Sequence, residues 1–173
     1  MTAIRACRTC GTELRENERF CHGCGSPIAA ADTHASDKQV TGLFADVYVA
    51  RERARRGDRD GAIPVMRAGV DHLLREQRSR EWGIPATGVL VETLLERGTE
   101  SDVVEAEAAI ERLAAAPTDD DTALRDIWLL RLRALLARAR GEGVKYLDFL
   151  NRYRNMATSL GFEGHIAWAE AMP

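Results

Sequence analysis

Four cysteines in the first 24 residues are the side chains best suited to chemistry in this chain of 173 residues. They form two Cys-x-x-Cys-Gly motifs with ten residues between them. The two-residue gap lets a tight turn aim both sulfurs at one point, and the glycine that follows permits the positive φ of such a turn. Four thiolates complete a tetrahedral shell around Zn²⁺ and leave no position for a catalytic water. The pattern predicts a structural zinc site with the ligands Cys7, Cys10, Cys21 and Cys24.

Two disulfides, or a redox-active Cys-x-x-Cys pair, are the alternatives for these cysteines. The duplicated spacing and the reducing compartment expected for this chain favour zinc. Because so short a segment cannot bury a core of its own, metal binding would supply its folding free energy. His22 is a candidate ligand in place of one cysteine, but with four thiolates present we expect it to be an exposed turn residue.

The rest of the chain predicts a mostly α-helical protein. Residues 1–28 would form the small N-terminal zinc ribbon, and the small, polar residues 29–40 would form a flexible linker. From residue 41 to 173, apolar residues recur at helical spacing. Three Arg-Gly pairs, at intervals of 41 and 43 residues, have the composition of helix C-termini: Arg56-Gly57, Arg97-Gly98 and Arg140-Gly141.

These breaks predict three antiparallel helical hairpins and a short terminal helix over 163–171. The paired segments are 41–56 with 60–78, 84–97 with 101–115, and 121–140 with 143–160. Pro85 suits a helix start, and Pro117 with Asp119 to Asp121 separates the fourth helix from the fifth. Each hairpin needs a neighbour to cover its apolar face, which indicates a small helical-repeat stack. The period exceeds the roughly 34 residues of a tetratricopeptide repeat, so the fold is tetratricopeptide-like only.

Composition and charge limit the function classes. The net charge of −3 gives no general attraction to nucleic acid, and we interpret the basic stretch at 51–59 as a solvated helix face. No apolar run at the N-terminus resembles a signal peptide, and the uncharged stretch 82–91 is too short to span a bilayer. We therefore expect a cytoplasmic protein without membrane contact. No phosphate-binding glycine motif and no nucleophile–base pair is recognisable. His72 and His165 have no evident partner, and the three tryptophans are predicted to be packing residues.

Three segments resemble one protein family. The cysteine motifs, ending in RFCHGCGSPI, resemble the zinc ribbon that precedes some bacterial class III adenylyl cyclases. The stretch KQVTGLFADV at 38–47 is similar to the first strand of the cyclase catalytic domain. Residues 48–173, which end in GFEGHIAWAEAMP, are similar to the C-terminal helical region of large actinobacterial cyclases. The resemblance implies a multidomain adenylyl or guanylate cyclase from which the catalytic domain and an ATPase domain have been deleted internally.

Asp46 is the one residue at which the resemblance implies a catalytic position, as a metal-binding aspartate. Cyclisation of ATP needs two carboxylates that hold two metal ions, and the second aspartate of the family has no counterpart here. The chain is therefore predicted not to be an enzyme. Because Leu43, Val47, Ala50 and Ala54 have helical spacing, we expect residues 41–48 to be absorbed into the first helix, with Asp46 at the surface. A surviving strand is the alternative.

The leading hypothesis is a non-catalytic, zinc-binding helical-repeat protein, derived from a cyclase, that acts through contact with a protein partner. One alternative is an adenylate cyclase-related protein that contributes to cyclic nucleotide synthesis or its regulation. A second is a transcriptional regulator, against which the acidic balance and the lack of a helix-turn-helix argue. The identity of the partner and the oligomeric state are left open.

Overall fold

The computed structural model describes residues 5–6, 10–14, 22–24, 33–75, 80–117 and 123–172. The chain divides into two compact units, residues 1–41 and residues 42–173. In the first unit, β1 (Arg5–Ala6) pairs antiparallel with β2 (Glu13–Leu14). Arg5 lies opposite Leu14 and Ala6 opposite Glu13, so the connection between the strands carries the first cysteine motif.

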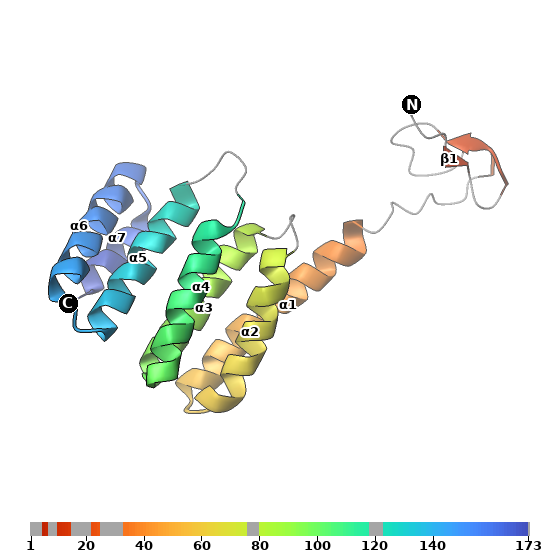
Figure 1. The fold of residues 1–173 in the computed structure, drawn as a ribbon. Coiled ribbons are helices and arrows are strands. Elements are labelled where there is room, and N and C mark those ends of the chain that lie inside the picture. Colours follow the sequence, from red (N-terminus) through yellow and green to blue (C-terminus); the bar gives the residue numbers. More distant parts are fainter. Residues whose placement is uncertain are drawn as a thin grey trace. The chain divides into compact units, whose positions relative to one another are not determined.

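The described part of the chain is mostly helical, as the apolar spacing predicted (Figure 1). Its helices are α1 (Thr33–Arg55), α2 (Arg59–Arg75), α3 (Arg80–Arg97), α4 (Glu100–Ala115), α5 (Ala123–Ala139), α6 (Gly143–Leu160) and α7 (Glu163–Ala171). The pairs α1–α2, α3–α4 and α5–α6 are the three expected hairpins. Gly57, Gly98 and Gly141 follow the first helix of each pair with φ of 104°, 74° and 71°. This left-handed conformation is easy for glycine only, and it confirms the predicted helix ends.

Contacts between side chains make α1, α3, α5 and α7 successive neighbours. Phe44 on α1 and Trp82 on α3 have ring centroids 4.7 Å apart, Glu92 on α3 pairs with Arg131 on α5, and Trp128 on α5 lies 5.5 Å from Trp168 on α7. The core between these helices and α2, α4 and α6 is made of fully buried large side chains. They include Ile63, Met66, Leu73, Leu90, Leu94, Ile110, Leu113, Ile127, Leu132, Leu150 and Tyr153.

The predicted linker over 29–40 is wrong in part, because α1 already begins at Thr33. Residues 33–40 contain no glycine or proline, and extending an existing helix costs little compared with starting one. The start of the third helix was also misplaced: α3 begins at Arg80, so Pro85 is inside it and not at its start. Packing explains the extra turn, since Trp82 contacts Phe44 and a Cβ on Gly83 would lie 2.9 Å from Leu74.

Ion pairs join neighbouring hairpins at nearly one repeat of separation. Arg67 on α2 binds Glu105 on α4, 38 residues away, through two bonds of 2.5 Å. Arg112 binds Asp71 at 2.6 Å across 41 residues, and Glu92 and Arg131 are 39 residues apart. These separations are close to the spacing of the turn glycines. Each ion pair therefore joins equivalent positions of two successive hairpins. Exposed pairs of this kind contribute little stability each, but they favour one register of stacking.

Asp102 is a buried carboxylate at the start of α4, with 1% of its surface exposed. Arg97 donates to both of its oxygens, at 2.8 and 2.5 Å, and the Thr99 amide donates to it at 3.1 Å as part of a capping box. The Arg97 guanidinium is the main reason why the pKa of Asp102 is held well below its usual range. This pair fixes the turn between α3 and α4.

We predict that Arg97→Met lowers the free energy of unfolding by about 3 kcal/mol, because it leaves a buried, unpaired carboxylate. Chemical denaturation at neutral pH measures the change. Arg112→Met is the matched control, since its pair with Asp71 is about half exposed and should contribute no more than about 1 kcal/mol. Equal losses in the two variants would contradict the structural role of Asp102.

Among the described residues, no helix combines the length and the apolarity that crossing a membrane requires.

Candidate functional site

Two of the four predicted zinc ligands lie within the described residues. Cys10 directly precedes Gly11, which has a φ of 74°, so the first motif makes the positive-φ turn that the sequence predicted. Cys24 belongs to the described turn at 22–24, and both cysteines are exposed. The Cys10 Sγ lies 3.1 Å from the Oγ1 of Thr12. Cys7 and Cys21 lie outside the described residues.

The two cysteine motifs are brought together through Thr12 and Gly23. A Cβ placed on Gly23 would lie 2.5 Å from Thr12 Oγ1, so only glycine permits this close approach. Thr12 is also the residue that the Cys10 sulfur contacts. The turn that carries Cys24 therefore packs against the segment that carries Cys10. Convergence of the two motifs is what a shared metal site requires. His22 is exposed in the same turn, as predicted.

Asp46 is exposed on α1, and residues 41–48 are helical, so the strand alternative for this segment is wrong. The helical spacing of its neighbours was the correct signal, since Val47, Ala50 and Ala54 are buried. Asp46 is therefore a surface carboxylate of a helix in this structure.

A second candidate site is the exposed side of α1, α3 and α5. Glu92 on α3 pairs with Arg131 on α5 and lies 3.7 Å from Arg51 on α1. Arg131 also lies over the rings of Trp168 and Trp128, at 4.9 and 5.5 Å from their centroids. A guanidinium held by a carboxylate and two aromatic faces is fixed in position. We call Arg51, Glu92 and Arg131 the ionic ladder.

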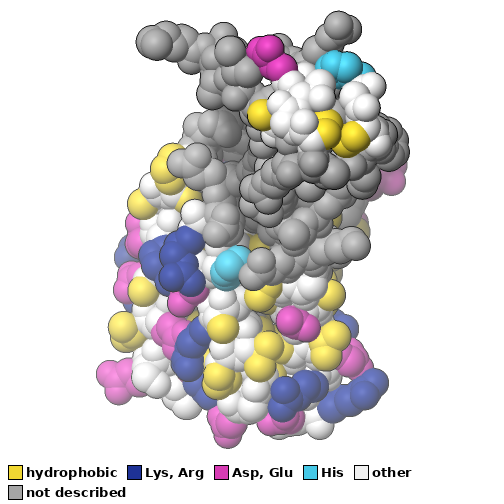
Figure 2. Space-filling model, turned by 90° about the vertical axis from the view of Figure 1, so that its right-hand side faces the viewer, with side chains coloured by type: hydrophobic (Ala, Val, Ile, Leu, Met, Phe, Trp, Pro, Cys, Tyr) yellow, Lys and Arg dark blue, Asp and Glu magenta, His cyan; other side chains and the backbone are white. Residues whose placement is uncertain are grey.

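Aromatic side chains lie at both ends of the ionic ladder. Phe44 contacts Tyr48 and Trp82 with centroid separations of 4.7 Å in both cases, and Trp82 is 41% exposed. At the other end, Trp168 is 43% exposed. Exposed tryptophans and positioned arginines are typical of protein contact surfaces. Figure 2 shows another side of the helical unit, the end with α1 and α2, where hydrophobic side chains are interspersed with charged ones.

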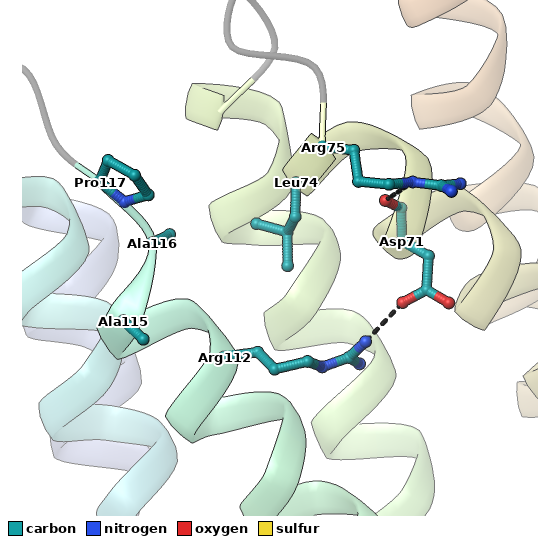
Figure 3. A pocket seen from close by; sticks show the side chains of 7 residues that line it. All are labelled: Asp71, Leu74, Arg75, Arg112, Ala115, Ala116 and Pro117. Carbon is teal, nitrogen blue, oxygen red and sulfur yellow. Dashed lines mark hydrogen bonds and ion pairs between the residues drawn. The ribbon is translucent and has the colours of Figure 1, made fainter.

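Cavities lined by described residues open on the helical unit. One, of about 400 Å³, lies between α3 and α5 and is lined by Glu92, Leu95, Glu96, Arg131, Leu135, Arg138 and Ala139. It continues the surface of the ionic ladder. Another, of about 450 Å³, lies where α2 and α4 end, beside Asp71, Leu74, Arg75, Arg112, Ala115, Ala116 and Pro117 (Figure 3). There Asp71 accepts from Arg112 through its carboxylate and from Arg75 through its backbone carbonyl.

His165 forms a buried polar contact that the sequence analysis missed. Its Nδ1 lies 2.9 Å from the hydroxyl of Tyr153, and the ring is 8% exposed beside Trp128 and Trp168. Burial, and then the charge of Arg131, lower the pKa of His165 to about 4, and burial raises the pKa of Tyr153 to about 12. The imidazole is therefore neutral and the phenol protonated at pH 7, and the tautomer of His165 decides which of the two donates the hydrogen bond. The two residues are twelve positions apart and on different helices, so no local sequence pattern marks them as partners.

We predict that the helical unit loses stability as the pH falls from about 6.5 towards 4. Over this range the unfolded chain protonates His165 and the folded chain does not, so the slope reaches about 1.4 kcal/mol per pH unit. Above pH 6.5 the histidine contributes no further change. Denaturation of the wild type and of His165→Gln at pH 7 and pH 5 measures the difference. Identical slopes for the two proteins would contradict the buried, neutral state of His165.

The fold thus defines a stack of antiparallel helical hairpins preceded by a small strand-paired unit that carries the cysteine motifs. No protein-family model, no curated protein and no solved structure matches the chain.

Proposed function

We propose that this chain is a non-catalytic, zinc-binding helical-repeat protein that acts through contact with a protein partner. The observation that carries the proposal is the side of α1, α3 and α5 on which the partly buried ionic ladder, the exposed Trp82 and Trp168 and a cavity of about 400 Å³ lie. Exposed tryptophan and positioned arginine are the residues that contribute most at protein interfaces. The surface is open and spans three helices, which suits a peptide or a protein better than a small substrate.

The proposal also assigns a structural zinc ion to the first unit. The positive φ at Gly11 and the close approach of Gly23 to Thr12 are consistent with four thiolates around one Zn²⁺. In this proposal Cys7, Cys10, Cys21 and Cys24 hold a structural ion that stabilises a contact surface and does no chemistry. On the resemblance to cyclases, we propose that both units derive from a cytoplasmic multidomain cyclase, the first from its zinc ribbon and the second from its tetratricopeptide-like region.

Affinity purification of the full chain after cross-linking in its own cells tests the proposal. We expect to recover one partner protein at a constant ratio to the bait. A variant whose helical unit is unfolded by substitution should no longer recover that protein. An empty purification, or equal recovery with the unfolded variant, would contradict the proposal. The enzyme alternative requires formation of cyclic AMP from ATP and Mn²⁺ by the purified chain, and the regulator alternative requires salt-sensitive binding to duplex DNA.

A further inference from the structure

The cavity between α3 and α5 combines an apolar wall with charged edges. Leu95 on α3 and Leu135 on α5 line it and are half-buried, so each still presents apolar surface to solvent. Glu92 and Glu96 on α3 face Arg131 and Arg138 on α5 across it. A volume of about 400 Å³ accommodates a bulky apolar side chain together with part of a backbone.

The ion pairs around this cavity leave one of its charges without a partner. The lining carries two carboxylates, Glu92 and Glu96, and two guanidinium groups, Arg131 and Arg138. Arg51 and Arg131 share Glu92, and Arg59 lies 3.9 Å from Glu96. Arg138 is exposed in the last turn of α5 and has no ion pair within the described part of the chain. The charge without an ion pair at this cavity is therefore positive, although the whole chain is acidic.

The arginines at this cavity are positioned before any ligand binds. Arg131 is fixed by Glu92 and by the rings of Trp168 and Trp128, and its Nε is buried without a hydrogen-bond partner in the described structure. A side chain that is already ordered loses little conformational entropy on binding. Arg138 supplies the accessible donors, because guanidinium binds carboxylate through two parallel hydrogen bonds.

Resting on the proposed function, we propose that the α3–α5 groove binds an acidic peptide segment of the partner protein. A carboxylate of the peptide binds Arg138, and an apolar side chain of the peptide packs between Leu95 and Leu135. The Arg138 guanidinium favours an acidic segment over a basic one, because the carboxylates of Glu92 and Glu96 already lie beside Arg131, Arg51 and Arg59. The apolar wall favours a peptide over a simple anion.

Selection from a displayed library of random peptides on the full chain tests this inference. We expect enriched peptides to carry several Asp or Glu residues and one bulky apolar residue. A synthetic, fluorescently labelled member of that set should bind Arg138→Glu about tenfold or more weakly than wild type, and raising the salt concentration should weaken its binding. Arg152→Glu is the matched control, because it makes the same charge change on exposed α6 and should leave binding unchanged.

Enrichment of basic peptides, or an equal loss of binding in Arg138→Glu and Arg152→Glu, would overturn the inference. A captured partner that binds Arg138→Glu as tightly as wild type would overturn it too, and would leave the proposed function standing. The reverse result, acidic peptides that need Arg138 but no partner recovered from cells, would support the groove and overturn the proposed function. Circular dichroism of both variants confirms that the charge reversals leave the helices intact.

Discussion

Removal of metal from the purified chain is expected to unfold the N-terminal unit and to leave the helical unit folded. The expectation follows because residues 1–41 form a compact unit of their own, in which the described strand pair is only two residues long on each side. Structural zinc supplies about 10–16 kcal/mol to small sites of this type, more than so short a segment can gain from burial. Metal analysis should give one zinc per chain, and a chelator should release it while the thermal transition of the helices stays in place.

Substitution identifies the ligands. Cys7→Ser combined with Cys24→Ser should abolish zinc binding, whereas His22→Ala should retain a full equivalent, since His22 is exposed in its turn. Replacement of zinc by Co²⁺ should give the sulfur-to-cobalt charge-transfer absorption of a thiolate site. Less than half an equivalent of zinc in freshly purified protein, or a mass that shows two disulfides, would refute the site.

Gly88→Val is expected to destabilise the helical unit by about 3 kcal/mol, because there is no room for a side chain at this position of α3. A Cβ on Gly88 would lie 2.2 Å from Cζ3 of Trp128 and 2.8 Å from its Cε3. The indole cannot move away easily, since it is 7% exposed and is in contact with His165, Trp168 and Arg131. Overpacking a fixed ring shifts backbone or forces strained rotamers. Chemical denaturation of both proteins measures the loss.

A second glycine provides the control for this experiment. Gly42 lies in α1, and a Cβ built on it meets no atom within 4 Å. Gly42→Ala should therefore stabilise its helix by about 0.5–1 kcal/mol, through the lower conformational entropy of alanine in the unfolded chain. If Gly88→Val were as stable as the wild type, the close packing of α3 on α5 would be wrong.

The helices could be predicted because their signals are local. Helical spacing of apolar residues predicted the hairpins, and glycines with positive φ end the helices where the Arg-Gly pairs predicted. Local signals failed where tertiary packing overrides them. Trp82 continues α3 upstream of Pro85 by packing on Phe44, and the small polar residues from Thr33 extend α1.

The candidate contact surface could not be predicted, because its residues meet only through stacking of hairpins. Glu92 and Arg131 are 39 residues apart, and nothing in either helix alone marks them as partners. The same is true of Gly88, whose small size makes sense only beside Trp128. By contrast, the cysteine motifs carry their ligand types and their spacing within 24 residues, so the zinc hypothesis needed no tertiary information.

The ionic ladder gives the stack a second role besides stability. Each exposed ion pair contributes about 1 kcal/mol at most, so hydrophobic burial between the helices must supply most of the folding energy. Charged groups that recur one hairpin apart, however, set the same level on successive helices and hold their arginines in fixed positions, with 35% of the Arg51 side chain and 13% of the Arg131 side chain exposed. Arg51 and Arg131 are placed in this way on either side of Glu92. A surface ordered so that arginines flank an apolar cavity suits recognition of another chain.

The dissociation constant between the purified full chain and the protein recovered from cells tests the central claim most directly. We expect saturable binding by isothermal titration calorimetry, with a fixed stoichiometry and no requirement for ATP. We expect that binding to be lost at a denaturant concentration at which Gly88→Val is unfolded while the wild type is still folded and still binds. Binding that survives unfolding of these helices, or the absence of saturable binding together with cyclic AMP formation by the chain, would contradict it.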